Sequence, residues 1–135
     1  MNKPIHSTND DYPSQDFDWG TLTWFVSREL KNSESMTVGR CILKSGFSNP
    51  KHRHPNCDEV LHLVAGRIIC GVGEEEFEMG LGDTITIPTD LPHYARNIGE
   101  ADAVMLICFS SADRESILVE ESGRGTCMKV SRSCS

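Results

Sequence analysis

The 135-residue chain has no long apolar run, and no stretch approaches the roughly 20 apolar residues that a membrane-spanning helix needs. Its first residues, Met1 to His6, are polar and contain no hydrophobic segment of a signal peptide. Positive charge is also scarce, with 13 Lys and Arg against 20 Asp and Glu and a net charge of −7. Sequence-independent nucleic-acid binding depends on such cations, so we expect no nucleic-acid partner. We expect no membrane partner either, and a cytoplasmic location.

Aromatic residues make up only 7% of the chain and hydrophobic residues 38%, a composition typical of one ordinary globular domain. The six cysteines show no Cys-x-x-Cys spacing, so we expect no zinc site around Cys127 and Cys134. Three other cysteines stand inside apolar runs and are predicted to be buried as small hydrophobes: Cys41, Cys70 and Cys108.

Short β-branched and aliphatic runs alternate with turns marked by glycine and proline, at the spacing of about 8–12 residues that is typical of all-β sandwiches and barrels. The predicted strands are 18–26, 36–43, 60–64, 67–72, 76–79, 84–87, 94–98, 103–110 and 117–119. A helical turn is expected at 111–114. Residues 1–16 read as an N-terminal arm, 17–121 as the β-barrel domain, and 122–135 as a flexible C-terminal tail, native or derived from an expression vector.

His52 and His54 stand one residue apart on an extended segment, so their rings point to the same side. Glu59 follows after a turn, and His93 follows a later turn at 90–92. Three imidazoles and one carboxylate suit one divalent metal ion per chain, such as Mn, Fe, Co, Ni, Cu or Zn. On a metal that prefers six ligands, these four leave two positions for water, substrate or dioxygen.

The spacing of these residues resembles the two motifs of the cupin superfamily. The first motif is Gly46, five residues, His52-x-His54, four residues, Glu59, six residues and Gly66. The second is Gly82, five residues, Pro88, then His93, three residues and Asn97. Asp90 departs from the pattern because it stands where glycine is usual. Aspartate tolerates turn conformations, so we expect a local cost and an intact fold.

The resemblance implies a small single-domain cupin with a jelly-roll barrel, that is, a double-stranded β-helix. It also implies a homodimer and a mononuclear metal-dependent enzyme that acts on a small molecule. The first hypothesis is an oxidoreductase of the dioxygenase type acting on a small hydroxylated or carbonyl compound, as in cupins that act on flavonols, reductones or oxalate. Glu59 would then be a metal ligand and the catalytic proton acceptor.

Two alternatives remain. The metal could act as a Lewis acid in a non-redox isomerase, tautomerase or lyase for a sugar or uronate-like metabolite. The barrel could instead be a non-catalytic module that binds a sugar. A zinc-loaded protein indifferent to oxygen would exclude the first hypothesis. Loss of turnover in His93→Ala, with the fold intact, would exclude the binding module.

Inward strand positions would form the substrate pocket, although the sequence does not fix which face each residue occupies. The candidates are Trp24, Met36, Val38, Arg40, Leu61, Thr86 and Phe109. Arg40 is the best candidate to hold an anionic substrate, with a surface ion pair as the alternative. By alternation, His62, Arg53, Tyr94 and Arg96 face away from the metal.

Two further expectations concern the surroundings of the site. Cys57 lies between His54 and Glu59 in the sequence, and we expect a partly exposed thiol without a chemical role. The aromatic run from Trp19 to Val26 is the expected sheet edge for self-association.

Overall fold

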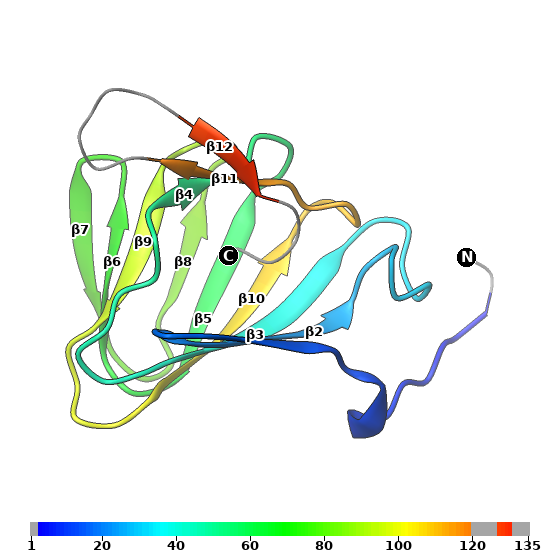
Figure 1. Ribbon diagram of the computed structural model, residues 1–135, viewed down its shortest axis with the longest axis horizontal. Coiled ribbons are helices and arrows are strands. Elements are labelled where there is room, and N and C mark those ends of the chain that lie inside the picture. The colour runs from blue at the N-terminus through cyan, green and yellow to red at the C-terminus, as the bar shows by residue number, and fades with distance from the viewer. Residues whose placement is uncertain (1–2, 120–126, 131–135) are drawn as a thin grey trace.

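A computed structural model describes residues 3–119 and 127–130, which fold into a jelly roll of two six-stranded antiparallel sheets (Figure 1). Sheet A runs in the order β1 (Ser14–Phe17), β2 (Gly20–Val26), β3 (Thr37–Leu43), β10 (Ala103–Phe109), β5 (Glu59–Ala65) and β8 (Thr84–Ile87). Sheet B runs in the order β12 (Cys127–Val130), β11 (Ser116–Val119), β4 (His52–Arg53), β9 (His93–Asn97), β6 (Ile68–Val72) and β7 (Glu75–Met79). The all-β jelly roll is therefore confirmed.

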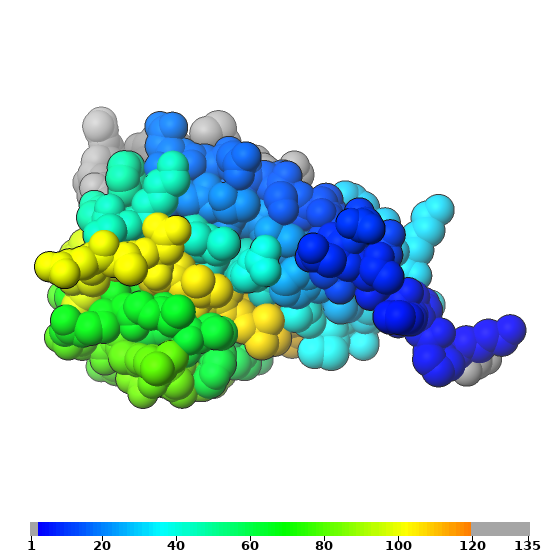
Figure 2. Space-filling model, turned by 90° about the horizontal axis from the view of Figure 1, so that it is seen from below, coloured from blue at the N-terminus to red at the C-terminus, as the bar shows by residue number. Residues whose placement is uncertain are grey.

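The described residues contain one helical element, the short 3-10 helix η1 (Asn9–Asp11). None of their helices is long and apolar enough to span a bilayer. The N-terminal segment that carries η1 projects from the body of the molecule (Figure 2). Its aromatic residue Tyr12 contacts the Phe25 ring edge to face, with the ring centroids 4.7 Å apart.

Most predicted strands are present, and β8 has the predicted bounds. Residues 18–19 of the predicted strand 18–26 form a turn, so β2 begins at Gly20, and Ser14–Phe17 form the additional strand β1 against β2. Because β1 covers β2, the run from Trp19 to Val26 is not a sheet edge, and this prediction is wrong. Residues 111–114 form a turn without helix.

In the predicted C-terminal tail, 127–130 form β12, which pairs with β11. The rest of that prediction, including Cys134, lies outside the described residues.

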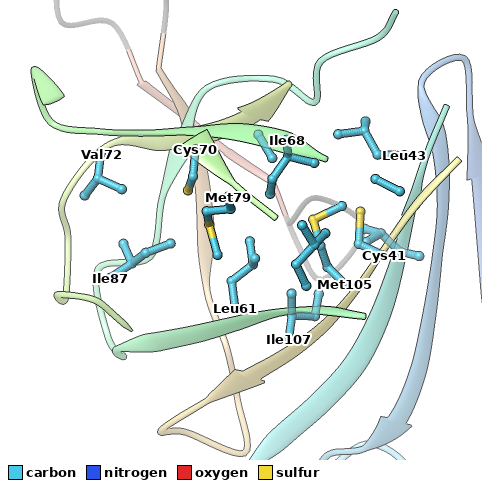
Figure 3. Packing of buried hydrophobic residues seen from close by; sticks show 14 of the residues in the cluster. Cys41, Leu43, Leu61, Ile68, Cys70, Val72, Met79, Ile87, Met105 and Ile107 are labelled. Carbon is cyan, nitrogen blue, oxygen red and sulfur yellow. The ribbon is translucent and has the colours of Figure 1, made fainter. Parts of the chain in front are cut away.

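The core lies between the two sheets and is filled mainly by aliphatic and sulfur-containing side chains (Figure 3). Cys41 and Cys70 are buried in it as predicted. Cys108 is only half-buried, because it takes the outward position between two inward neighbours in β10, so its predicted burial is wrong.

The strand pairing brings different kinds of side chain to the two ends of the barrel interior. At the end that we call the packed end, Ala103 pairs with Leu43, and Leu63 and Ile68 are fully buried nearby. The buried amide of Asn97 is fully hydrogen-bonded there. Its Nδ2 donates to the carbonyls of Leu43 and Ala101, and its Oδ1 accepts from the Gly99 amide.

At the opposite end, which we call the histidine end, Phe109 pairs with Glu59 on one side and with Thr37 on the other. Across the barrel, His52 of β4 pairs with His93 of β9. Sheet A therefore brings a carboxylate to this end, and sheet B brings two imidazoles.

Candidate metal centre

Four ionisable side chains meet at the histidine end: His52, His54, Glu59 and His93. One nitrogen or oxygen atom from each lies within 4.8 Å of the others. All four side chains are almost completely buried, with exposed fractions between 1% and 4%. The structure thus brings together the four residues that the sequence predicted as ligands. Metal binding by them stays a prediction.

The histidine rings are oriented by backbone carbonyls. Nδ1 of His52 lies 2.7 Å from the Pro50 carbonyl, and Nδ1 of His93 lies 2.9 Å from the Leu91 carbonyl. Because a carbonyl only accepts, each Nδ1 carries a proton. Nε2 of His52 therefore presents a lone pair in the neutral ring, whereas Nε2 of His93 donates to Glu59 when the ring is protonated and presents a lone pair when it is neutral.

His54 is held by a more distant part of the chain. Its Nδ1 donates to the carbonyl of Glu115 at 2.8 Å. Asn56 fixes that segment, because its Nδ2 donates to the Asp113 carbonyl at 2.9 Å and its Oδ1 accepts from the Glu115 amide at 3.0 Å. The third ring is therefore oriented like the other two.

The Nε2 atoms of the three rings do not all have hydrogen-bond partners in the protein. Nε2 of His93 lies 2.9 Å from Oε1 of Glu59, and Nε2 of His54 lies 3.2 Å from the same oxygen. The Nε2 atoms of His52 and His54 are buried without a hydrogen bond. Such orphaned buried atoms are costly unless something satisfies them, and a metal ion about 2.0–2.2 Å from each donor would do so. The residues present fit a divalent metal.

Burial and mutual proximity shift the ionisation of the cluster. Burial alone would raise the pKa of Glu59, but its hydrogen bond with His93, its close contact with His54 and the charges of the two rings outweigh burial and lower it. Burial lowers the pKa of His93, but the hydrogen bond and charge of Glu59 overcome this and raise it. For His52, burial and repulsion by the other two histidines keep the pKa well below 6.5. Glu59 is therefore ionised at neutral pH and available to a cation.

Of the predicted pocket residues, Leu61 and Phe109 lie beside the cluster. Leu61 borders a cavity of about 10 Å³ that His52, Glu59 and His93 also line. The Phe109 ring contacts the His54 ring edge to face, with centroids 5.0 Å apart. This cavity has room for about one water molecule.

Four of the residues predicted to line the substrate pocket do not take inward strand positions. In β3 the inward positions are Thr37, Gly39, Cys41 and Leu43, so Val38 and Arg40 lie on the outer face. There the Arg40 guanidinium lies over the Phe25 ring, 5.6 Å from its centroid. Met36 precedes the strand with 46% of its surface exposed, and Thr86 takes an exposed position in β8.

The residues predicted to face away from the metal do so. His62 lies on the outer face, where its Nδ1 lies 2.7 Å from the Thr84 hydroxyl. Arg53 pairs with Asp90, and Asp90 has a φ of 67°, the left-handed conformation that favours glycine. Aspartate is accommodated there with the fold intact, as expected.

The side chain of Cys57 is more buried than the sequence predicted. The side chain is 2% exposed, and burial raises the pKa of its thiol to about 11, which opposes ionisation. The expected partial exposure is wrong because the turn that carries Cys57 packs against the core.

Sequence reasoning missed Arg114 and the Glu115 carbonyl. Arg114 is 3% exposed, and its guanidinium lies over the rings of Trp24 and Phe109, 4.4 and 5.2 Å from their centroids. No spacing in the sequence marks either residue, since a carbonyl contact depends on backbone position and not on residue type.

The chain is similar in sequence to a known protein family and to several plant proteins. A family model described as "Cupin domain" matches residues 39–109. Germin-like protein 3-8 of Oryza sativa subsp. japonica is 33% identical over 85 residues, which cover 59% of this chain and 38% of that protein. Oxalate oxidase 1 of Hordeum vulgare is 26% identical over 96 residues, which cover 65% of this chain and 48% of that protein.

Solved structures show the same fold. The formate complex of Lactobacillus farciminis oxalate decarboxylase has a TM-score of 0.75 at 23% identity, over 81% of this chain and 34% of that one. A structure of Bacillus subtilis oxalate decarboxylase described by its Mn(II) centres has a TM-score of 0.72 at 22% identity, over 76% of this chain and 29% of that one. The chain aligns with only about a third to a half of each of these four proteins. The family match spans more than half of this chain and includes all four clustered residues, so the chain belongs to the cupin domain family.

Proposed function

We propose that this chain is a metal-dependent enzyme that oxidises a small hydroxylated or carbonyl substrate. The observation that carries the proposal is the convergence of four buried donors, two of which have inner nitrogens with no hydrogen bond. A cluster that only stabilised the fold would have its buried polar atoms paired, as those of Asn97 are.

The roles of the residues follow from their contacts. His52, His54 and His93 would hold the ion through Nε2, while the carbonyls bound to their Nδ1 atoms fix the rings. Glu59 would supply the charged oxygen and, in a second role, take a proton from a substrate hydroxyl. Leu61 and Phe109 would limit access of water beside the cluster. When bound, the metal would supply Lewis-acid polarisation and, if redox-active, electron transfer.

The relatives indicate which metal and substrate to test first. One is named oxalate oxidase, and others in the same fold are named oxalate decarboxylase, in one case with Mn(II) centres. These proteins are more than twice as long as the matched part, so oxalate and manganese are starting points for this chain and not assignments.

The test begins with elemental analysis of the purified protein and of His52→Ala, with His62→Ala as the matched control on the outer face. We expect one equivalent of a redox-active metal per chain in the wild type and the control, and a large loss in His52→Ala. Oxygen uptake is then measured with oxalate, small hydroxy acids and sugars. A zinc-loaded protein that consumes no oxygen with any of them would contradict oxidation.

We also propose that the chain is a cytoplasmic homodimer. Sedimentation equilibrium of the purified protein tests the dimer, and cell fractionation tests the location. A single species of 15.0 kDa at working concentration would contradict the dimer.

A further inference from the structure

The outer face of sheet A is mainly apolar, although the solvent-facing side of an antiparallel sheet is commonly polar. Its central strands β3, β10, β5 and β8 lie side by side (Figure 1). Their outward positions, which we call the sheet A face, are Val38, Arg40, Ile42, Val104, Leu106, Cys108, Val60, His62, Val64, Thr84 and Thr86. Leu106 is central in this face, because it pairs with Arg40 on one side and with His62 on the other.

The apolar side chains of this face are open to solvent. Val60, Val64 and Leu106 are 37%, 48% and 36% exposed, and they are among the most exposed large hydrophobic residues of the described chain. A contiguous exposed apolar surface is uncommon on a protein that remains monomeric, and it typically marks an interaction surface.

The two basic side chains of the face contact neighbours on the same side of the sheet. The Arg40 guanidinium lies over the Phe25 ring, 5.6 Å from its centroid. Nδ1 of His62 lies 2.7 Å from the Thr84 hydroxyl. Both side chains therefore lie against the sheet and leave the apolar surface between them uncovered.

The outer face of sheet B has the opposite character. Beside the apolar Ile69, its outward positions carry Glu76, Glu78 and Arg96. The Tyr94 hydroxyl donates to Glu76 at 2.6 Å on this side of the sheet. The apolar surface is therefore a property of sheet A alone and does not follow from the fold.

Charge indicates which partner the sheet A face suits. The chain has 20 Asp and Glu residues and a net charge of −7, yet no outward position of this face is acidic. A basic partner would be attracted to carboxylates, which the face lacks. A second copy of this acidic chain can approach here without placing carboxylates opposite carboxylates.

The size of the face also suits a dimer. Strands lie about 4.8 Å apart and rise about 3.3 Å per residue, so the four strands and the adjoining seven-residue β2 cover roughly 24 Å by 23 Å. This outline is roughly 550 Å² before the relief of the side chains is added. A stable dimer takes about 800 Å² of accessible surface from each partner, which a corrugated face of this outline approaches.

We propose that two copies of this chain pack with their sheet A faces against each other, around a two-fold axis close to Leu106. A two-fold axis brings the same patch of both copies together, so an uncharged apolar centre is the arrangement that such a contact needs. The proposal rests on the homodimer proposed above and names the surface that forms it.

Sedimentation equilibrium of the wild type, Leu106→Glu and Ile69→Glu tests the interface. Ile69→Glu is the matched control, because it makes the same kind of change on the outer face of sheet B. We expect the wild type and Ile69→Glu to be dimers of equal affinity. Leu106→Glu should weaken dimerisation about 100-fold or more, because it buries two carboxylates opposite each other.

Two further measurements locate the contact. Val64→Glu, at the most exposed apolar position of the face, should also weaken the dimer. Alkylation of Cys108 by N-ethylmaleimide, followed by mass spectrometry of its peptide, reports whether the face is covered. We expect slower alkylation in the wild-type dimer than in Leu106→Glu, and faster alkylation when the wild type is diluted until it dissociates.

A dimer that persists in both Leu106→Glu and Val64→Glu would overturn this interface and leave the homodimer standing. A monomeric wild type would overturn both. An equal loss of the dimer in Ile69→Glu would also overturn the interface. Circular dichroism reports whether each variant folds, and if Leu106→Glu does not, Val64→Glu and the dilution of the wild type decide. Metal analysis measures a separate property, so the enzyme proposal can fail independently.

Discussion

The two ends of the barrel interior differ in how their buried polar atoms are hydrogen-bonded. At the packed end, the buried Asn97 amide has hydrogen-bond partners within the protein for both its nitrogen and its oxygen. At the histidine end, two imidazole nitrogens are equally buried without a hydrogen bond. The packed end therefore stabilises the fold by itself. The two unpaired nitrogens of the histidine end need a partner from outside the protein.

The largest expected effect tests the packed end. Leu63 is fully buried there, so Leu63→Ala removes its contacts and leaves a cavity. We expect a loss of about 2–5 kcal/mol in the free energy of unfolding, measured by urea denaturation. The metal content of the folded variant should equal that of the wild type. A parallel loss of metal would show that the two ends are not independent.

The second effect tests the histidine end. His52→Ala removes a donor whose Nε2 has no other partner, so we expect metal affinity to fall about 100-fold or more, measured by competition with a chromophoric chelator. His62→Ala, on the outer face, is the control and should bind metal as the wild type does. An unchanged affinity in His52→Ala would remove His52 from the ligand set.

A smaller effect depends on pH in the metal-free protein. The lowered pKa of Glu59 gives stability that is present above pH 4.5 and is lost as pH falls through the folded value. The raised pKa of His93 gives stability that is present below pH 6.5 and is lost as pH rises through the folded value. The pair therefore contributes most between these two pH values.

Unfolding of the wild type and Glu59→Gln across this range measures the contribution of the pair. We expect the stability difference between them to be largest between pH 4.5 and 6.5 and to decline on both sides. An NMR titration should place His93 above pH 6.5 in the metal-free wild type and below its wild-type value in Glu59→Gln. A difference in stability that does not change with pH would contradict the assigned ion pair.

The smallest effect is expected at Asp90, on the rim of the histidine end. Asp90→Gly relieves the left-handed backbone conformation but removes the exposed ion pair with Arg53 and adds freedom to the unfolded chain. These terms oppose one another, so the free energy of unfolding should change by about 1 kcal/mol or less. Thermal denaturation of the two proteins is sufficient to measure this, and a loss of several kcal/mol would show that the turn depends on the aspartate.

The same contrast explains what the sequence could predict. His52 and His54 could be placed on one side of an extended segment from strand alternation, which is local, whereas Glu59 and His93 were joined to them through the resemblance to the two cupin motifs. The outward position of Arg53 and His62 follows from the same alternation. The strands were identifiable for a similar reason, since β-branched runs and turn residues mark them.

The rest depends on contacts between distant segments. In β3, Val38 and Ile42 are as apolar as Cys41 and Leu43, so hydrophobicity alone does not show which set faces inward. β1 was missed because three of its four residues are polar, and it forms a strand by pairing with β2. The burial of Cys57 likewise depends on packing that no local pattern contains.

The hydrogen bond from His54 to the Glu115 carbonyl also sets an order of assembly. The other two rings are oriented by carbonyls two residues away, so the groups that orient them are synthesised together with them. The anchor of His54 lies 61 residues further along. A nascent chain on the ribosome therefore has all three imidazoles before it has the support for one of them. We expect the chain to bind metal with full affinity only after the segment that contains Glu115 has been synthesised and has folded.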